Sequence, residues 1–426
     1  MDPALLLFYL NSFSMLIMAI YALRHYIYSA IHVILSLRPI KNPGEGPPVP
    51  QEGLPRVSIL IPAHNEENVI GGLLKSLVTQ DYPKELMEVI VINDGSTDKT
   101  GDIARAFAKR FNFVKVVDIY PGGNGKAQAL NIGLEHAKGD VILVFDADYV
   151  PMFDCVRRLV ENLMDGRYGV VQGNIIPYNH GTFFSKVVRL ERLVGYELEF
   201  PVRDALRLFV QYGGTVGGFR REVIERVGKW RRNTLAEDTD LTCRAMIHGF
   251  KIKYVRDALA LEQAVDNLWA YIKQRFRWMK GHIQCFFRYT WGILRSPYMT
   301  LREKVDGVLL LAMYLTPLAW LTTTIYVLAG LLSWVKPPIV ESILGLTLLQ
   351  MFLTSLITES LVATITSEEK TRSLLPAILA IPIISYMLAI VALAALISLL
   401  TDKITGETKW PKTEKRPLPP LTPIQP

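Results

Sequence analysis

The apolar residues of this chain of 426 residues gather in four long stretches, and that segregation constrains the fold more than any other feature. Each stretch is about as long as a helix must be to cross the hydrocarbon core of a bilayer. The stretches are 4–23, 307–335, 339–364 and 374–400. The mixed segment between the first two is long enough for one sizeable domain with its own core. The sequence therefore predicts a multi-pass membrane protein with one large globular domain.

Charges around the first stretch predict the side of the membrane on which that domain lies. Asp2 stands where a signal peptide would carry basic residues, and no small-x-small cleavage site precedes Arg24, so we expect a retained anchor. Arg24, Arg38 and Lys41 follow the anchor, and the positive-inside rule puts such a flank in the cytoplasm. We therefore expect a cell-membrane protein whose large domain is cytoplasmic.

The side of the C-terminal tail stays open. Three spans after a cytoplasmic domain would put the tail outside, whereas its basic residues favour the inside. A break at Pro382 would turn 374–400 into a re-entrant pair and bring the tail inside.

Charge and cysteine usage exclude several classes of partner. The net charge of +7 is explained by basic flanks at an anionic membrane surface. No concentrated basic face stands out, so we expect no nucleic-acid partner. The cysteines, Cys155, Cys243 and Cys285, are widely spaced, which argues against a disulfide framework and a structural zinc site.

Short runs rich in Val and Ile alternate with helical patterns in the first part of the domain. The runs are 57–61, 88–92, 114–117 and 141–145. Such alternation predicts a mostly parallel α/β sheet, in which ligands bind beyond the carboxyl ends of the strands. Polar residues follow three of these runs: Asn65 and Glu66, Asp94, and Asp146 with Asp148. The sequence therefore predicts a ligand site at this edge.

Two carboxylates after the fourth run suit a metal and a diphosphate. Asp146 and Asp148 stand at i and i+2, so in an extended segment their side chains point the same way. Carboxylate oxygens suit Mg²⁺ or Mn²⁺, which neutralises a departing diphosphate. The alternative is a solvated turn. Asp94, before Gly95, also suits ligand contact, with an Asx-turn or a helix N-cap as the alternative.

Later residues suit phosphate binding and proton transfer. Lys126, in a Gly-rich loop, offers a cation to phosphate. Asp238 is either a general base for an acceptor hydroxyl or an acid that complements a helix dipole. Arg277 and Trp278 offer a fork for phosphate and a flat face for a sugar ring, or else anchor the chain at the membrane interface. The segments 183–198 and 268–289 read as amphipathic helices in the interface plane, with ordinary core-facing helices as the alternative.

Seven motifs in a fixed order resemble those of the family-2 membrane glycosyltransferases, a group containing cellulose, hyaluronan and poly-N-acetylglucosamine synthases. The motifs are Pro62-Ala-His-Asn-Glu66-Glu67, Asn93-Asp94-Gly-Ser, Gly125-Lys126-Ala-x-Ala-Leu-Asn131, Asp146-Ala-Asp148, Gly217-Gly-Phe-Arg-Arg221, Glu237-Asp238 and Gln274-x-x-Arg277-Trp278. The resemblance implies a GT-A-type, Rossmann-like catalytic domain, a UDP-sugar donor, Mg²⁺ or Mn²⁺, and inversion at the anomeric carbon.

The resemblance also implies a role for each matching residue. For nucleotide-sugar binding it implies Ala63, Glu66, Asp94, Lys126 and Asp146. Asp148 would hold the metal, and Asp238 would be the catalytic base. At the acceptor and diphosphate end it implies Glu237, Gln274, Arg277 and Trp278.

These expectations divide the chain into six parts. They are an anchor (1–36), a linker (37–55), a cytoplasmic GT-A domain (56–265), interface helices (266–304), C-terminal transmembrane helices (305–400) and a polar tail (401–426).

The leading interpretation of function is an enzyme of the membrane that elongates a polysaccharide from UDP-N-acetylglucosamine or UDP-glucose and translocates it. The alternative is transfer of one sugar to a lipid, either a polyprenyl phosphate or a glycolipid precursor. A nucleotide-binding sensor is a third interpretation, which the full set of acidic residues disfavours. The expected partners are the donor, a glycan or lipid acceptor and membrane lipids. An accessory subunit or an oligomer stays open.

Overall fold

The computed structural model of the protein describes residues 3–37, 53–179, 181–332, 334, 339–367 and 371–405. Most of the expected linker, and the tail beyond residue 405, lie outside the described residues.

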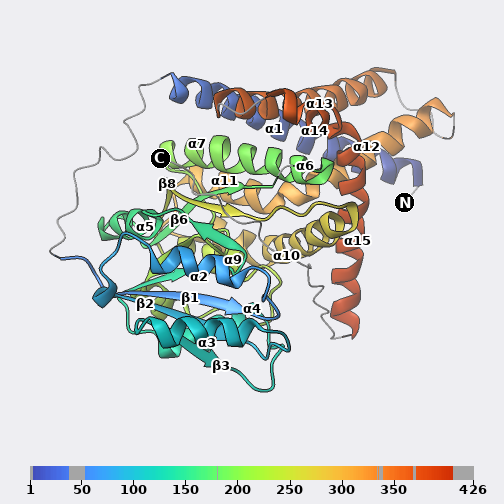
Figure 1. Ribbon diagram of the computed structural model, residues 1–426. Helices are drawn as coiled ribbons and strands as arrows, with labels where there is room; N and C mark the ends of the chain where they lie inside the picture. The colour runs from blue at the N-terminus through green and yellow to red at the C-terminus, as the bar shows by residue number, and fades with distance from the viewer. Residues whose placement is uncertain are drawn as a thin grey trace.

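Within the described residues the strands form one mixed sheet, which lies below the apolar helices in Figure 1. Across the sheet the order is β3 (Val114–Asp118), β2 (Met87–Asn93), β1 (Val57–Ala63), β4 (Val141–Val144), β7 (Gly217–Arg220), β6 (Val170–Pro177), β8 (Ile252–Glu262) and β5 (Tyr149–Pro151). The first four are parallel, as the sequence predicts. In the other half, β7 runs antiparallel to β4 and β6, and β5 runs antiparallel to β8, an arrangement that the sequence pattern did not predict.

The parallel strands β1, β2 and β4 are buried on both faces, because helices cover the sheet, whereas the edge strand β3 is partly exposed. All four residues of β4 are buried, and β1 is buried except at Pro62. The covering helices are α2 (Ile70–Val78), α3 (Thr100–Arg110), α4 (Lys126–His136), α5 (Cys155–Met164), α8 (Arg221–Val227) and α9 (Glu237–Ile247). The strand order reverses at β1, which lies between β2 and β4, and such a switch point leaves a crevice at the carboxyl ends of the strands.

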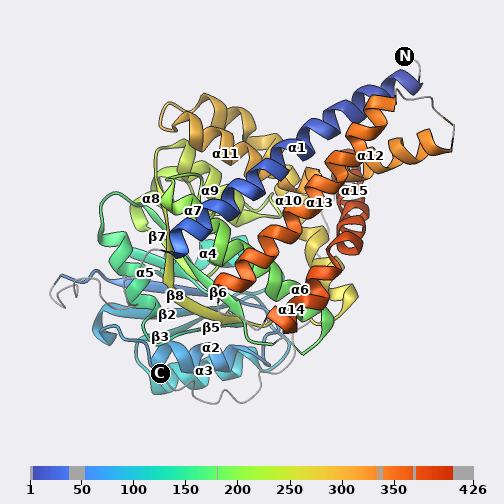
Figure 2. The same cartoon turned by 90° about the horizontal axis from the view of Figure 1, so that it is seen from above.

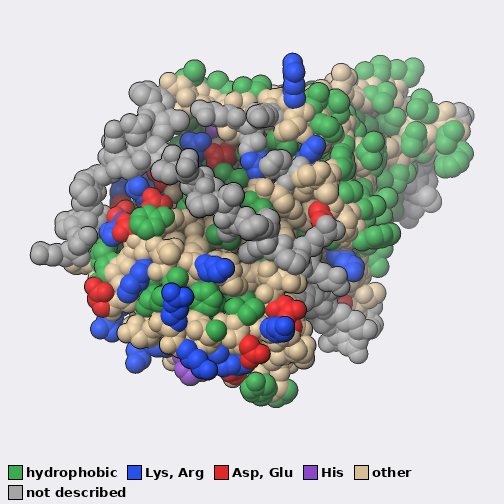
Figure 3. All heavy atoms as spheres, viewed as in Figure 1, with side chains coloured by type: hydrophobic (Ala, Val, Ile, Leu, Met, Phe, Trp, Pro, Cys, Tyr) green, Lys and Arg blue, Asp and Glu red, His purple; other side chains and the backbone are tan. Residues whose placement is uncertain are grey.

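In the described part of the chain, four helical stretches are long and apolar enough to cross a membrane: Leu5–Ser36, Leu301–Leu331, Ile339–Thr366 and Ile381–Asp402. They belong to α1 (Pro3–Ser36), to α11 (Leu301–Ala312), η3 (Met313–Leu315) and α12 (Thr316–Leu331) together, to α13 (Ile339–Thr366) and to α15 (Ile381–Thr405). Helices α1 and α13 run side by side (Figure 2). Hydrophobic side chains cover this part of the surface, whereas charged side chains gather over the sheet domain (Figure 3). The fold is therefore a Rossmann-like domain joined to helices compatible with a membrane bundle.

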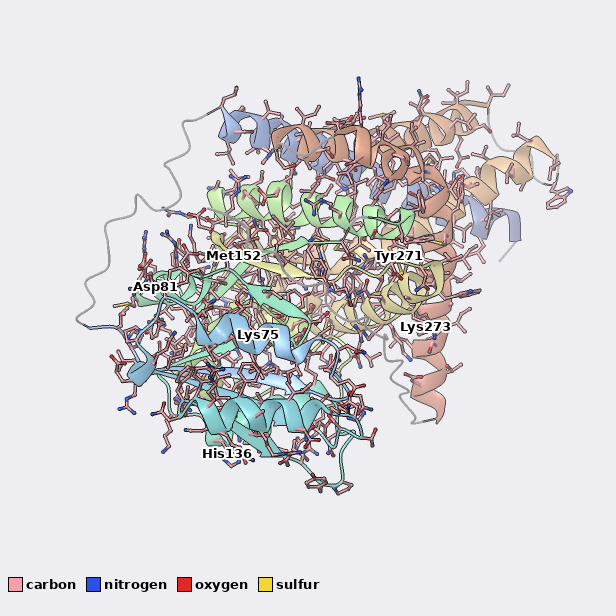
Figure 4. The ribbon with its side chains drawn as sticks, in the orientation of Figure 1. Lys75, Asp81, His136, Met152, Tyr271 and Lys273 are labelled. Carbon is pink, nitrogen blue, oxygen red and sulfur yellow. The ribbon has the colours of Figure 1, made fainter. Side chains whose placement is uncertain are left out.

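A layer of helices lies between the sheet and the apolar helices. It contains α6 (Phe183–Arg192), the π-helical segment η2 (Leu193–Glu199), α7 (Phe200–Ala205) and α10 (Leu268–Arg295). Tyr271 of α10 is buried and lies toward α6, whereas Lys273 is exposed (Figure 4). The two segments expected to be amphipathic are thus helical, and each has one face packed within the protein.

The last apolar stretch is broken, as a proline there allows. Helix α14 (Thr371–Leu379) ends before Ala380, and α15 begins at Ile381, with Pro382 in its first turn. Helix α14 packs against α6. The break thus separates a short helix on the side of the sheet domain from the long α15.

Candidate active site

A cavity of about 980 Å³ begins at the carboxyl ends of the parallel strands and extends to the apolar helices. Its lining includes every residue to which the family resemblance gives a role: Ala63, Glu66, Asp94, Lys126, Asp146, Asp148, Glu237, Asp238, Gln274, Arg277 and Trp278. The chain positions of these residues span more than 200 residues, so only the fold brings them together.

Asp94, after β2, anchors the Gly-rich loop that precedes α4. Its Oδ2 accepts a hydrogen bond from the Gly125 backbone (3.0 Å), and its Oδ1 accepts one from Asn124 (3.2 Å). A Cβ on Gly95 would lie 2.4 Å from the Gly122 Cα, and Gly95 has a φ of +62°. The close approach that glycine permits here is therefore to the protein's own loop, whereas the sequence suggested a ligand.

Lys126 lies among carboxylates at the end of β4. It is the first residue of α4 and not part of the preceding loop, which corrects the expectation from sequence. Its Nζ lies 2.7 Å from Asp146 Oδ1 and 3.5 Å from Glu237 Oε1, and it donates to the Gly214 carbonyl (3.0 Å). Asp148, two residues after Asp146 in the sequence, is also buried.

The first turn of α9 supplies Glu237 and Asp238. Asp238 accepts a hydrogen bond from the Thr239 backbone (2.6 Å), and its carboxylate faces the cavity near Gly214, where a Cβ would lie 3.1 Å from Oδ2. Asp240, two residues on, is fully buried and accepts hydrogen bonds from Arg244 and Tyr289. Asp240 therefore serves the packing of α9 and does not line the cavity.

Burial and neighbouring charges shift the pKa values of the side chains around Lys126. Burial raises the pKa of the Asp146, Glu237 and Asp238 carboxyls, although the Lys126 ammonium opposes the shift in each case. Burial would lower the pKa of Lys126, but Asp146 and Glu237 outweigh that effect and raise it. The donor end of the cavity is thus an acidic pocket around the ammonium group of Lys126.

Helix α10 brings Gln274, Arg277 and Trp278 to the same cavity. Gln274 Oε1 is buried and has no hydrogen-bond partner among the described residues, which suits an oxygen that meets a ligand hydroxyl. Arg277 lines the cavity together with Glu237, and its positive charge opposes the rise in the pKa of Glu237. The guanidinium of Arg275 lies 4.2 Å from the centre of the Trp278 ring.

Several cavity residues escaped the sequence analysis because they belong to no local motif. Arg192, Glu262 and Tyr149 come from three separate elements and are joined by hydrogen bonds. His282 also lines the cavity, and burial lowers its pKa to about 4, so its ring is neutral at physiological pH. Among these residues, Arg192 offered a signal in the sequence, because it is a charged residue at the end of a segment that is expected to be amphipathic.

The far end of the cavity lies among the apolar helices and is mainly hydrophobic. Its lining there includes Pro317, Phe352, Leu356, Ile381, Ile384 and Leu388. Tyr314, Trp320 and Glu359 also line it. Two further polar residues of α13, Glu341 and Gln350, do not. Glu341 accepts hydrogen bonds from Asn11 (3.3 Å) and Tyr326 (2.8 Å), and Gln350 is exposed on the outer face of α13.

Comparison with known proteins identifies the domain. Residues 58–228 match the model of a protein family described as Glycosyl transferase family 2. The chain thus carries a glycosyltransferase domain of family 2, as the motifs indicated. In fold it is similar to the mannosyltransferase PcManGT from Pyrobaculum calidifontis, solved in complex with GDP-Man and Mn²⁺. The TM-score is 0.59 and the identity 22%, over 82% of this chain and 98% of that chain.

Curated relatives carry names of sugar transferases. The chain is 39% identical to the probable glycosyltransferase YdaM of Bacillus subtilis (strain 168), over 54% of this chain and 56% of that protein. It is 32% identical to a beta-monoglucosyldiacylglycerol synthase of Nostoc sp., over 70% of this chain and 63% of the relative. It is 27% identical to a poly-beta-1,6-N-acetyl-D-glucosamine synthase of Staphylococcus epidermidis, over 64% of this chain and 66% of the relative. The chain therefore spans less than two thirds of the length of each of these relatives.

Proposed function

We propose that the protein is an inverting β-glycosyltransferase of the cell membrane, which transfers a sugar from a UDP-sugar to an acceptor that enters from the bilayer. One observation carries the proposal: the cavity joins the acidic pocket at the strand ends to the hydrophobic space among the apolar helices. A polar donor and a membrane-borne acceptor can therefore meet inside one cavity. The basic residues after the anchor favour a cytoplasmic catalytic domain.

Donor binding uses the ends of β1, β2 and β4. Ala63, Glu66 and Asp94 surround the position proposed for the uridine, and Asp94 also fixes the loop that closes over it. Lys126 and Arg277 offer positive charge to the diphosphate. UDP-N-acetylglucosamine and UDP-glucose are the proposed donors, because the S. epidermidis relative is named for the first sugar and the Nostoc relative for the second.

Asp146 and Asp148 fit a divalent cation. Among the described residues no group of three or more His, Cys, Asp or Glu side chains could hold a metal by itself. Mg²⁺ and its analogues, however, are commonly held by one or two carboxylates together with substrate phosphates. The excess of carboxylates over cations in the pocket supports such a site. When bound, the metal would supply positive charge that stabilises the departing diphosphate.

Asp238 is the proposed general base. It faces the cavity from the first turn of α9, and the bend at Gly214 keeps the space beside its carboxylate open. As the acceptor hydroxyl attacks the anomeric carbon, Asp238 would take the hydroxyl proton and the C–O bond to the diphosphate would break. Trp278 would stack on the acceptor end and Gln274 would bind one of its hydroxyls.

The wall of the membrane end favours a lipid-borne acceptor over a growing glycan. Hydrophobic side chains from α12, α13 and α15, aromatic as well as aliphatic, line much of this wall, and they match a hydrocarbon chain better than a polar polymer. The Nostoc relative is named for a diacylglycerol product. Elongation and translocation of a polysaccharide is the second candidate, supported by the ring faces of Tyr314 and Trp320 in the cavity wall.

The proposal is tested with purified full-length protein in lipid nanodiscs. We expect Mg²⁺- or Mn²⁺-dependent release of UDP from UDP-N-acetylglucosamine or UDP-glucose when dioleoylglycerol or a polyprenyl phosphate is present. Product sizing should then give a single sugar on lipid. A long polymer protected inside reconstituted vesicles would support the second candidate instead. Donor binding without any UDP release would contradict both.

A further inference from the structure

A largely buried ion pair joins two separate elements that both line the cavity. Arg192 is the last residue of α6, and Glu262 is the last residue of β8. Arg192 Nε lies 2.6 Å from Glu262 Oε1, and Arg192 Nη2 lies 2.9 Å from Oε2, so the two groups meet as a bidentate fork. The side chains are only 18% and 6% exposed. Such a pair fixes both position and orientation, which a single contact does not.

Glu262 extends this contact to the donor end. Tyr149 OH donates to Glu262 Oε2 at 2.7 Å, and the two residues are also paired across β5 and β8. Tyr149 follows Asp148 directly in the chain. The bidentate pair is thus connected to the segment that carries the carboxylate proposed for the metal.

Arg192 extends the contact to the acceptor end. Its guanidinium lies 5.3 Å from the centre of the Trp278 ring, within the range of a cation–π interaction. The preceding residue, Glu191, binds Arg275, whose own guanidinium lies 4.2 Å from the same ring. The regular helix changes to a π-helix immediately after Arg192, a distortion that is frequent at functional sites.

We infer that Arg192 is a positioning residue, which orients Trp278 for the acceptor and couples that orientation, through Glu262 and Tyr149, to the metal–diphosphate end at Asp148. The description of these ends as the acceptor end and the metal–diphosphate end rests on the proposed function. The coupling between Trp278 and the segment of Tyr149 and Asp148 rests only on the contacts described above. Arg192, which lies outside the seven motifs, is thereby assigned a role in the site.

The first test measures the coupling without requiring turnover. Arg192→Lys keeps the charge but loses the fork and the flat guanidinium. In the full-length protein in nanodiscs, we expect faster hydrogen exchange of backbone amides in residues 268–282 and in β5. Glu262→Gln, which removes the charge with little change of shape, should raise exchange in the same segments. Unchanged exchange there in both variants would overturn the inference.

Arg157→Lys is the matched control. Arg157 forms a comparable two-contact pair with Asp81 (2.7 and 3.1 Å), and neither residue lines the cavity. Figure 4 shows Asp81 far from Tyr271 of α10. This variant should leave exchange in α10 and the transfer rate at wild-type levels. If it changes α10 as much as Arg192→Lys does, the effect is general loosening and the inference fails.

The second test is a double-mutant cycle on transfer, measured as UDP release from UDP-N-acetylglucosamine with Mn²⁺ and dioleoylglycerol. Arg192→Lys should lower acceptor-dependent turnover by about 10–100-fold, because small misplacements at a reacting site cost that much. Binding of UDP with Mn²⁺ should change by less than about twofold. Added to Trp278→Ala, the Arg192→Lys change should cost little more, because the two act as one unit. Additive losses would refute action through Trp278.

The tests separate failure of the inference from failure of the proposed function. If the wild-type protein releases no UDP with UDP-N-acetylglucosamine or UDP-glucose, the proposed function fails, and hydrogen exchange still decides the coupling. If the wild type turns over and Arg192→Lys matches it in both rate and exchange, the inference fails alone.

Discussion

At the donor end of the cavity, the carboxylates of Asp146, Asp148, Glu237 and Asp238 have different surroundings, which divide the work between them. Asp146 and Glu237 neutralise Lys126, whereas Asp148 and Asp238 lie in the two motifs to which we assign the metal and the proton. Asp240 illustrates the opposite outcome. It belongs to the same acidic run as Asp238, but the fold turns it away from the cavity toward Arg244 and Tyr289. Sequence position alone does not distinguish these two residues.

The first prediction concerns Asp148→Asn. We expect loss of turnover and a fall in metal-dependent UDP affinity of at least about 10–100-fold, the cost of losing even a supporting contact in a metal site. Asp118→Asn, at the end of β3 and outside the cavity, is the control. Calorimetric titration of UDP with and without Mn²⁺ provides the measurement, and thermal unfolding checks the fold. Wild-type metal-dependent affinity in Asp148→Asn would remove this residue from the metal site.

The second prediction concerns Asp238→Asn. Removal of the base should slow transfer by about 10²–10⁴-fold while UDP-sugar binding stays close to that of the wild type. Burial raises the pKa of Asp238, and a base works only when ionised. The wild-type kcat should therefore fall, as pH decreases, at a higher pH than for an ordinary carboxyl group, and this acid limb should disappear in the variant. A variant with a near-wild-type rate would transfer the assignment to Glu237.

At the scale of elements, the contacts of α15 determine on which side of the apolar helices this helix ends. Ile381 and Ile384 of its first turn pack in a cluster with residues of α6 and α14. Near its last turn, Asp402 lies 2.6 Å from Lys280 Nζ of α10, which also donates to Ser398 (2.8 Å). Figure 1 shows α15 descending beside α10 toward the sheet domain. The described part of α15 therefore ends on the side of the catalytic domain.

The third prediction follows from this placement. In oriented membrane vesicles, a cysteine at Thr401→Cys should react with a membrane-impermeant maleimide from the same side as one at Lys109→Cys on α3. A cysteine at Trp334→Cys, between α12 and α13, should react from the opposite side. The native cysteines are buried, so they need not be replaced. Labelling of Thr401→Cys together with Trp334→Cys would show that α15 crosses the bilayer.

At the scale of the whole molecule, a buried ionic network fastens the catalytic domain to the apolar helices. Arg203 of α7 lies 2.6 Å from Asp306 of α11, which also accepts a hydrogen bond from Tyr28 of α1 (2.7 Å). Arg24 of α1 lies 3.0 Å from Glu199 at the end of η2. These contacts fix the position of the catalytic domain relative to the apolar helices. The continuous cavity depends on that position, because both parts line it.

The fourth prediction is that Arg203→Met destabilises the whole protein by about 3–5 kcal/mol, because it leaves Asp306 buried without its cation. Arg105→Met, which breaks an exposed pair with Asp102 and Asp118 on the outer surface, should destabilise the protein far less, because solvent screens such pairs. Thermal unfolding of both variants in detergent tests the difference. Equal unfolding temperatures would mean that the network contributes nothing to the joint.

Sequence patterns determined the features that depend on neighbouring residues. Runs of Val and Ile predicted the four parallel strands, and in β1, β2 and β4 burial on both faces requires such a continuous apolar segment. The polar residues after those runs predicted the site, because parallel strands end at one edge. Apolar stretches likewise predicted the long helices, although Glu341 and Gln350 showed that hydropathy does not tell which face of a helix meets the cavity.

Tertiary structure alone decided what depends on pairing between distant segments. The half of the sheet formed by β5 to β8 combines antiparallel pairs with the parallel pair β6–β8. Its strands pair with segments far away along the chain, and no local period records such pairing. The same holds for side-chain direction: Gly95 makes room for the protein's own Gly122, and Arg192 reaches Glu262 and Trp278 from an unrelated element. The sequence by itself determined which chemical groups are present and in what order, whereas packing decided which of them meet, because contact energies depend on distances that chain position does not specify.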